Sequence, residues 1–191
     1  MILVKPTREH MSGYVEAISK GWSPDNVRGA VTARDHLRRI AVAPDAFLGG
    51  LDDPEARGGP VTLPDGTQAE RLPGFVRWIW DGDYCGSISF RWKPGGAELP
   101  PHVLGHIGYA VVPWKQGRGY ATRALGLLLT QIGGLGLSHV DLTTDPANLA
   151  SQEVILANGG YLAERFTKLA AYGGGETLRF RIALEPRPIC P

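Results

Sequence analysis

The residues with the clearest chemical potential lie in one segment, residues 106–122, where a strand pattern leads through glycines into a helix pattern. Apolar and small residues run from 107 to 112, Pro113 ends the strand, and helical spacing begins near Gly119. In such a segment the unpaired N–H groups of the loop and of the first helical turn converge, and the helix dipole adds positive charge. The segment therefore predicts a binding site for an anion such as a phosphate group.

Two glycines make this loop suitable for close contact with a phosphate. Gly117 and Gly119 have no Cβ to keep a ligand away, and Arg118 between them carries a positive charge. A P-loop is excluded because the string G-x-x-x-x-G-K-[ST] does not occur in the chain. A dinucleotide fingerprint is disfavoured because Thr122 stands where G-x-G-x-x-G requires its third glycine.

The loop Gln116-x-x-Gly119-x-Ala121 matches the pattern [RQ]-x-x-G-x-[GA] and resembles the pyrophosphate loop of the GNAT superfamily of acyl-CoA N-acyltransferases. Residues 107–113 resemble the fourth strand of that family. Residues 143–151 and 158–161 resemble the region of its fifth strand and fourth helix. The order of predicted elements from residue 1 to 184 follows the family as well, so the resemblance covers nearly the whole chain.

The elements that must position this loop alternate between strand and helix patterns, with no visible linker. We expect an α/β fold (α+β mixed) that forms a single GNAT-like domain over residues 1–191. Its central sheet, part antiparallel and part parallel, would have about seven strands flanked by about four helices. The resemblance implies that this sheet splays between its fourth and fifth strands. Pro44 is expected to end or bend the second helix, and residues 49–73 are expected to form a long loop that could cover the acceptor.

The resemblance implies that acetyl-CoA binds as co-substrate between the fourth and fifth strands. Its pantetheine arm would pair with the backbone of residues 110–112, and the N–H of Ala110 would be the oxyanion donor. Asn148 also fits the N-cap of a helix, and both roles stay open. The residues implied to contact the co-substrate are Ala110, Val111, Val112, Gln116, Gly117, Arg118, Gly119, Tyr120, Ala121, Thr122, Asn148 and Ser151.

The resemblance also implies positions for the proton-transfer groups. His106 stands where several family members carry a glutamate base, and an ordinary histidine pKa of about 6.5 suits a base near neutral pH. The alternative is a histidine that only caps or packs the start of the strand. Other members use a tyrosine acid that would fall at position 155, where this chain has Ile155. The acid therefore stays unassigned.

The composition disfavours several other classes of function. Twenty Lys and Arg against 19 Asp and Glu give a net charge of +1, which argues against a nucleic-acid partner. Cys85 and Cys190 are too few for a disulfide scaffold, and no Cys/His spacing predicts a metal site. No apolar run is long enough for a membrane span and no secretory signal pattern occurs, so we expect a cytoplasmic protein without a membrane partner.

Together these features lead us to expect an N-acetyltransferase that transfers the acetyl group of acetyl-CoA to a primary amine of a small molecule. One alternative is a peptide or protein N-acetyltransferase. Another is a non-catalytic acyl-CoA sensor, which the missing tyrosine at position 155 would favour. Homodimers are common in the family that the chain resembles, although no interface can be read from the sequence.

Overall fold

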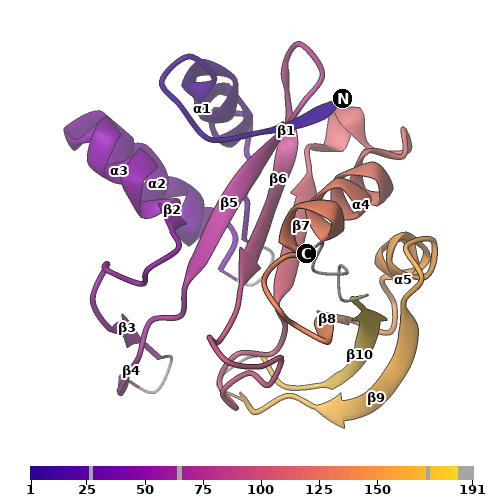
Figure 1. The fold of residues 1–191 in the computed structure, drawn as a ribbon. Helices are drawn as coiled ribbons and strands as arrows, with labels where there is room; N and C mark the ends of the chain where they lie inside the picture. Colours follow the sequence, from indigo (N-terminus) through magenta and orange to yellow (C-terminus); the bar gives the residue numbers. More distant parts are fainter. Residues whose placement is uncertain (26–27, 64–65, 171–172, 185–191) are drawn as a thin grey trace, which may run out of the picture.

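The strands form two main antiparallel sheets and one small two-stranded sheet in the computed structural model, which describes residues 1–25, 28–63, 66–170 and 173–184 (Figure 1). The first sheet has the order β1–β5–β6–β7, with β1 (Ile2–Val4), β5 (Gly74–Trp80), β6 (Tyr84–Arg91) and β7 (Ile107–Val111). The second has the order β8–β10–β9, with β8 (His139–Thr144), β10 (Glu176–Ala183) and β9 (Tyr161–Thr167). Three two-residue strands complete the set: β2 (Asp52–Asp53) pairs with β5, and β3 (Val61–Thr62) pairs with β4 (Gln68–Ala69).

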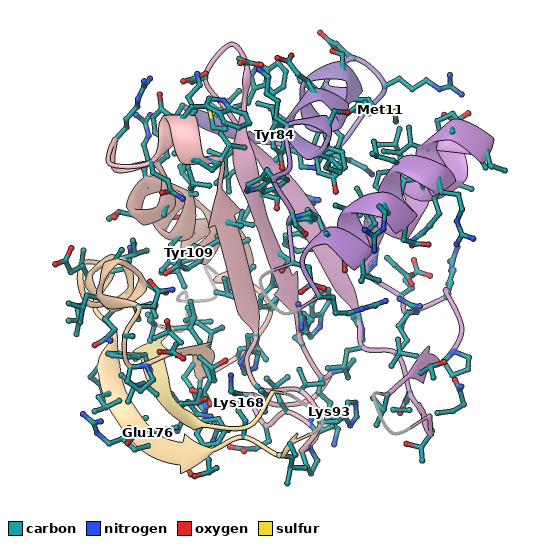
Figure 2. The ribbon with its side chains drawn as sticks, turned by 180° about the vertical axis from the view of Figure 1, so that it is seen from behind. Met11, Tyr84, Lys93, Tyr109, Lys168 and Glu176 are labelled. Atoms are coloured by element: carbon teal, nitrogen blue, oxygen red, sulfur yellow. The ribbon has the colours of Figure 1, made fainter. Side chains whose placement is uncertain are left out.

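Helices cover both faces of the first sheet (Figure 1, and Figure 2 from behind). The helices are α1 (Met11–Ser19), α2 (Ala30–Val42), α3 (Pro44–Gly50), α4 (Tyr120–Ile132) and α5 (Leu149–Leu156), with a 3₁₀ turn η1 (Pro113–Lys115). On one face Tyr14 of α1 stacks on Trp78 of β5 with ring centroids 4.8 Å apart. On the other face α4 buries Leu125 and Leu128 in a core shared with β6, β8, β10 and α5.

The second sheet is apolar on one face and polar on the other, as strand alternation requires. Val140 and Leu142 of β8, with Leu178, Phe180 and Ile182 of β10, join the core beneath α4 and α5. The opposite face carries His139, Asp141, Thr143, Arg179 and Arg181, which by register lie opposite one another on β8 and β10. This polar face lies beside the point where the two sheets meet.

The structure confirms the expected mixed α/β class and differs from the expectation in detail. The break at Pro44 is present, with α2 ending at Val42 and α3 beginning at Pro44. Within the described residues all strand pairs are antiparallel, because β7 and β8 separate instead of pairing along their length. Residues 49–73 hold the end of α3 and the strands β2, β3 and β4, which are too short to leave a periodic pattern. Five α-helices occur in this part of the chain, and none is long and apolar enough to cross a membrane.

Candidate functional site

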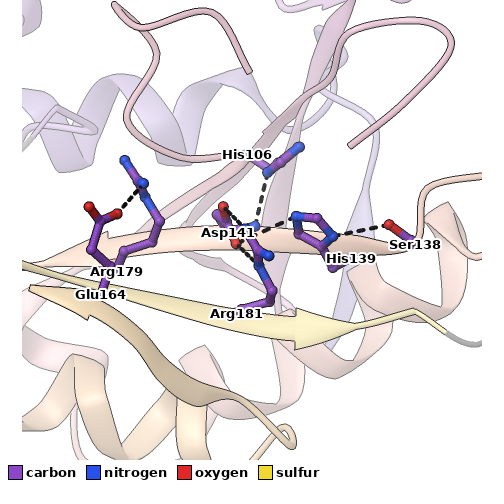
Figure 3. Close-up of polar contacts among 7 residues, drawn as sticks. All are labelled: His106, Ser138, His139, Asp141, Glu164, Arg179 and Arg181. Carbon is purple, nitrogen blue, oxygen red and sulfur yellow. Dashed lines mark hydrogen bonds and ion pairs between the residues drawn. The ribbon is translucent and has the colours of Figure 1, made fainter. Parts of the chain in front are cut away.

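His106, just before β7, joins the two sheets (Figure 3). The N–H of His106 donates to the carbonyl oxygen of Asp141 on β8 at 2.7 Å, and the N–H of Asp141 donates to Nδ1 of His106 at 2.9 Å. The imidazole thus takes the place of one backbone acceptor in a sheet ladder. Beyond this joint β7 and β8 belong to different sheets, so β7 has a free edge toward β8.

The register between β6 and β7 decides which groups this free edge presents. The N–H of Val112 donates to the carbonyl of Cys85, and the N–H of Arg91 donates to the carbonyl of His106, both at 2.9 Å. In an antiparallel pair, hydrogen-bonded positions alternate with positions whose backbone groups point outward. Even-numbered residues of β7 therefore face β6, and odd-numbered residues face the open edge.

Tyr109 and Val111 consequently carry the outward N–H and C=O groups. Ala110 lies opposite Ser87 of β6 and points its N–H toward that strand. The expectation that the N–H of Ala110 is the oxyanion donor does not fit this register, because a donor must face the ligand. Nε2 of Gln116 donates to the outward carbonyl of Val111 at 3.2 Å, so a side chain of the next loop satisfies one group of the edge.

The loop after β7 ends at the N-terminus of α4, where the N–H groups are arranged as an anion site requires. Gly117 and Gly119 have φ of 72° and 71°, a left-handed conformation that favours glycine. Gly119 is the N-cap of α4 and provides no side-chain cap, and the first turn of α4 contains no acidic residue. The N–H of Arg123 is the first to bond back, to Gly119, so the N–H groups of residues 120–122 have no helical acceptor. Residues 116–119, including Arg118, are exposed.

A carboxylate outside the motif holds this loop. Asp81, in the turn between β5 and β6, accepts hydrogen bonds from Nζ of Lys115 at 3.0 Å to each carboxylate oxygen. It also accepts one from the hydroxyl of Tyr120 at 2.5 Å. Tyr120 and Lys115 together keep the pKa of Asp81 well below its usual range, so the group stays ionised. We call these three residues the Asp81 brace.

The opposite wall is the first turn of α5. The side chain of Asn148 accepts from the N–H of Ser151 at 3.1 Å, so the cap role is present. The hydroxyl of Tyr109 lies 2.9 Å from Oγ of Ser151 and also donates to the Ser151 carbonyl at 3.2 Å. Burial raises the pKa of Tyr109, which keeps its hydroxyl protonated. Ile155, at the position of the missing tyrosine, is buried in the core.

Sequence reasoning missed the Tyr109–Ser151 pair, since Tyr109 looked like a core residue on the face opposite His106. The two residues are separated by 42 positions in the chain, so no local motif joins them. Strand alternation was the one available signal: it places Tyr109 on the face of β7 that packs toward the core of α4 and α5.

The environment of His106 does not suit a general base. The residue is 0% exposed, and its Nδ1 lone pair is occupied by the N–H of Asp141. Burial lowers the pKa of His106 to about 4, so the ring is neutral at pH 7 and binds a proton weakly. A base needs a free lone pair within reach of the amine. The geometry fits the packing alternative, with His106 joining the two sheets.

Two ion pairs line the polar face of the second sheet (Figure 3). Arg181 binds Asp141 through two hydrogen bonds of 2.8 and 3.0 Å, and Arg179 pairs with Glu164 of β9. Among the residues that the structure describes, no group of three or more His, Cys, Asp or Glu side chains could hold a metal ion. Cys190 lies outside the described residues.

Comparison with known families identifies the architecture of this site. Residues 61–160, which include β7, the anion-binding loop and α5, match the family model for the acetyltransferase (GNAT) domain. The chain belongs to the GNAT acetyltransferases. Among curated proteins no sequence match is found.

Solved structures of GNAT acetyltransferases share the fold of this chain. One is RimL, the ribosomal L7/L12 alpha-N-protein acetyltransferase in complex with coenzyme A, at 15% identity and a TM-score of 0.64, covering 96% of this chain and 94% of RimL. RimJ from Mycobacterium smegmatis, with a CoA disulfide, matches at 18% identity and a TM-score of 0.64, covering 97% and 83%. The microcin C7 self-immunity acetyltransferase MccE, with acetyl-CoA and AMP, matches at 12% identity and a TM-score of 0.58, covering 95% and 91%.

Proposed function

We propose that this GNAT protein transfers the acetyl group of acetyl-CoA to the α-amino group at the N-terminus of a protein. The observation that carries the acyl-CoA part is the free edge of β7 running directly into an unfilled helix N-terminus. An extended amide chain can pair with such an edge, and a pyrophosphate suits the N–H groups at its end. The β7 edge and the N-terminus of α4 would thus bind the two ends of the acyl-CoA arm.

Different backbone groups of the site bind different parts of acetyl-CoA. The carbonyl of Tyr109 and the outward backbone groups of Val111 pair with the pantetheine amides, and Gln116 leaves the Val111 carbonyl when they bind. The N–H groups of residues 117–122 take the pyrophosphate, with Arg118 as an additional charge. Acetyl-CoA supplies the activated thioester. The N–H of Tyr109, in place of that of Ala110, is the donor for the developing oxyanion.

The Tyr109–Ser151 pair is our candidate for the proton donor to the leaving thiolate. Ser151 lies at the start of α5, on the wall of the cleft opposite the free edge, and its hydroxyl shares a hydrogen bond with Tyr109. Oγ of Ser151 gives its proton to the sulfur, Tyr109 gives one to Ser151, and Tyr109 regains a proton through solvent, which takes up the proton that the attacking amine releases. General acid catalysis of this kind typically contributes roughly 10²- to 10⁴-fold in rate.

His106 does not suit a general base, and we assign no other described residue to this role, which favours an acceptor that is partly neutral on its own. An α-amino group has a pKa of about 7.7–8.0, so roughly a tenth of it is neutral at pH 7, whereas a lysine side chain with a pKa of about 10.4 is almost fully charged. A protein N-terminus therefore requires less help than an internal lysine. The fold neighbour RimL supports the same choice, since it is described as an alpha-N-protein acetyltransferase.

A small-molecule amine, the acceptor expected from the sequence, is the second candidate. The observation that favours it is the likeness to MccE, whose structure holds AMP beside acetyl-CoA. Both candidates use the same acyl-CoA side, and they differ only in what approaches from the polar side of the cleft.

The test measures CoA release with three acceptor classes: peptides with a free N-terminus, the same peptides N-formylated but carrying an internal lysine, and a panel of small amines. We expect turnover on free N-termini only, and a fall in kcat of about a hundredfold in Ser151→Ala with little change in the KM for acetyl-CoA. Turnover on small amines alone would replace the protein acceptor by the second candidate. Acetyl-CoA binding without turnover on any amine would make the protein a sensor.

A further inference from the structure

The face of the first sheet opposite α4 has an open strip of small residues. On this face of β6 Ser87 is buried, whereas Ser89 is partly exposed and Arg91 is exposed, and Ile88 and Phe90 point into the core. By register, Ser89 lies opposite Gly108, which is exposed although β7 is covered by α4 on its other face. In Figure 2 this part of the sheet lies between helices α2 and α3 on one side and α5 and β9 on the other.

Arg91 is the charged residue of this strip. Its Nη2 donates to Oγ of Ser89 at 3.5 Å, so the guanidinium folds back along the strand toward the level of Gly108. The hydroxyl of Ser89 in turn donates to the carbonyl of Gly108 at 3.2 Å. The positive charge of Arg91 therefore lies beside Ser89 and Gly108, and Gly108 is the neighbour of Tyr109 on β7.

Arg91 differs from the other arginines that extend from the two sheets' strands near this site. Arg77, Arg179 and Arg181 each form an ion pair with a carboxylate, whereas Arg91 has no ion pair in the described part of the chain. Desolvation lowers the pKa of Arg91, and Asp25 in the α1–α2 connection opposes that effect from a distance.

The carboxylate of Asp25 already accepts from the N–H of Arg28 and from the hydroxyl of Thr32, both at 2.9 Å. Arg91 itself is exposed, so its guanidinium is accessible to an anionic ligand, and charge-assisted hydrogen bonds are among the stronger ones.

We infer that Arg91 is a specificity-determining residue that selects acceptors with an acidic side chain at the second or third position from the N-terminus. The inference rests on the proposed function. The acetyl carbonyl lies at Tyr109, and an extended peptide advances about 3.3–3.4 Å per residue, the same rise as the strand beneath it. If the acceptor peptide runs from Tyr109 toward Gly108, its second or third residue lies at the level of Gly108, where the guanidinium of Arg91 lies.

The experiment compares peptides that differ only at positions two and three, with Glu at both or with the uncharged isostere Gln at both. For the wild type we expect a preference in kcat/KM of roughly tenfold or more for the Glu peptide, since hydrogen bonds to charged groups are the strong ones. In Arg91→Gln this preference should disappear because the rate on the Glu peptide falls while the rate on the Gln peptide stays. Arg91→Glu should favour a Lys-containing peptide instead.

Arg34→Gln is the matched control, because it removes one exposed positive charge from α2 and leaves the strip intact. It should keep the wild-type preference, and unchanged CoA affinity in all variants shows that the fold is preserved. Equal rates of the wild type on both peptides, or an unchanged ratio in Arg91→Gln, would overturn the inference and leave the proposed function standing. Failure of the wild type on every peptide would overturn the proposed function itself, and the inference with it.

Discussion

The two sides of the proposed site are built from different kinds of group. The side that we propose for acyl-CoA consists of backbone groups: the free edge of β7 and the first turn of α4, with the left-handed glycines Gly117 and Gly119 between them. The side that we propose for the acceptor consists of side chains, with Arg91 of β6 among them. A backbone site constrains few residue identities but constrains conformation tightly, whereas a side-chain site leaves no short pattern in the chain. This difference explains why the backbone side carries a family motif and the side-chain side does not.

The largest expected effect comes from breaking the backbone side at Gly119. Valine strongly disfavours a φ of 71°, so Gly119→Val must strain the chain or rotate the N–H groups of the first turn away from the ligand. Strain and lost contacts of about 2–3 kcal/mol correspond to roughly a hundredfold weaker binding of CoA, measured by calorimetry.

Gly134→Val is the control for this substitution. Gly134 is exposed just after α4, has no positive φ, and a Cβ there would meet nothing within 4 Å. CoA affinity should match the wild type in this variant. Equal affinity in Gly119→Val would show that the loop does not depend on its left-handed turn, and the contrast between the two sides would lose its basis.

The same contrast shows how much the sequence could predict. The strand–loop–helix order and the helix break at Pro44 were predictable, because glycine spacing, proline and apolar periodicity report local backbone conformation directly. The choice between Ala110 and Tyr109 was not, since it depends on which residues of β7 bond to β6, and that register is a property of two strands. A shift of one residue reverses the direction of every backbone group.

Contacts between distant residues were also beyond the sequence. His106 looked like a base because its type and position suited one, but burial and the N–H of Asp141 determine what its ring can do. Ser151 was expected at the cleft, yet its hydroxyl partner Tyr109 lies 42 positions away. Side-chain pairs of this kind depend on the folded arrangement of both sheets.

The next largest effect concerns His106, which joins the two sheets. The pKa of His106 is about 4 in the folded protein and about 6.5 when unfolded, so the unfolded chain binds more protons between these values. Stability must therefore fall as the pH drops below about 6.5. We expect titration of this histidine alone to lower the free energy of unfolding by about 2 kcal/mol between pH 7 and pH 5, measured by urea unfolding.

His106→Asn separates titration from structure, because the amide oxygen can accept from Asp141 as Nδ1 does and does not titrate. The variant should lose about 2 kcal/mol less than the wild type over the same pH interval. His10→Asn, at a histidine outside the joint, should keep the wild-type difference. If His106→Asn instead removes acetyl transfer at every pH while CoA still binds, the histidine is catalytic after all.

The smallest effect tests whether the backbone side also depends on side chains outside the motif. Tyr120→Phe removes one hydrogen bond of the Asp81 brace without changing charge, and Lys115 still holds the carboxylate. We expect the ordered loop to lose about 1 kcal/mol of stabilisation, which corresponds to roughly a fivefold increase in the KM for acetyl-CoA.

Asp81→Asn is a poorer probe of the brace. It removes a negative charge near the proposed pyrophosphate site, which favours binding, while it also weakens the brace, which disfavours binding. Acetyl-pantetheine, which lacks the pyrophosphate, is the decisive control: its KM should not change in Tyr120→Phe. An equal loss with both thioesters would mean that the brace supports the fold as a whole and not the phosphate loop.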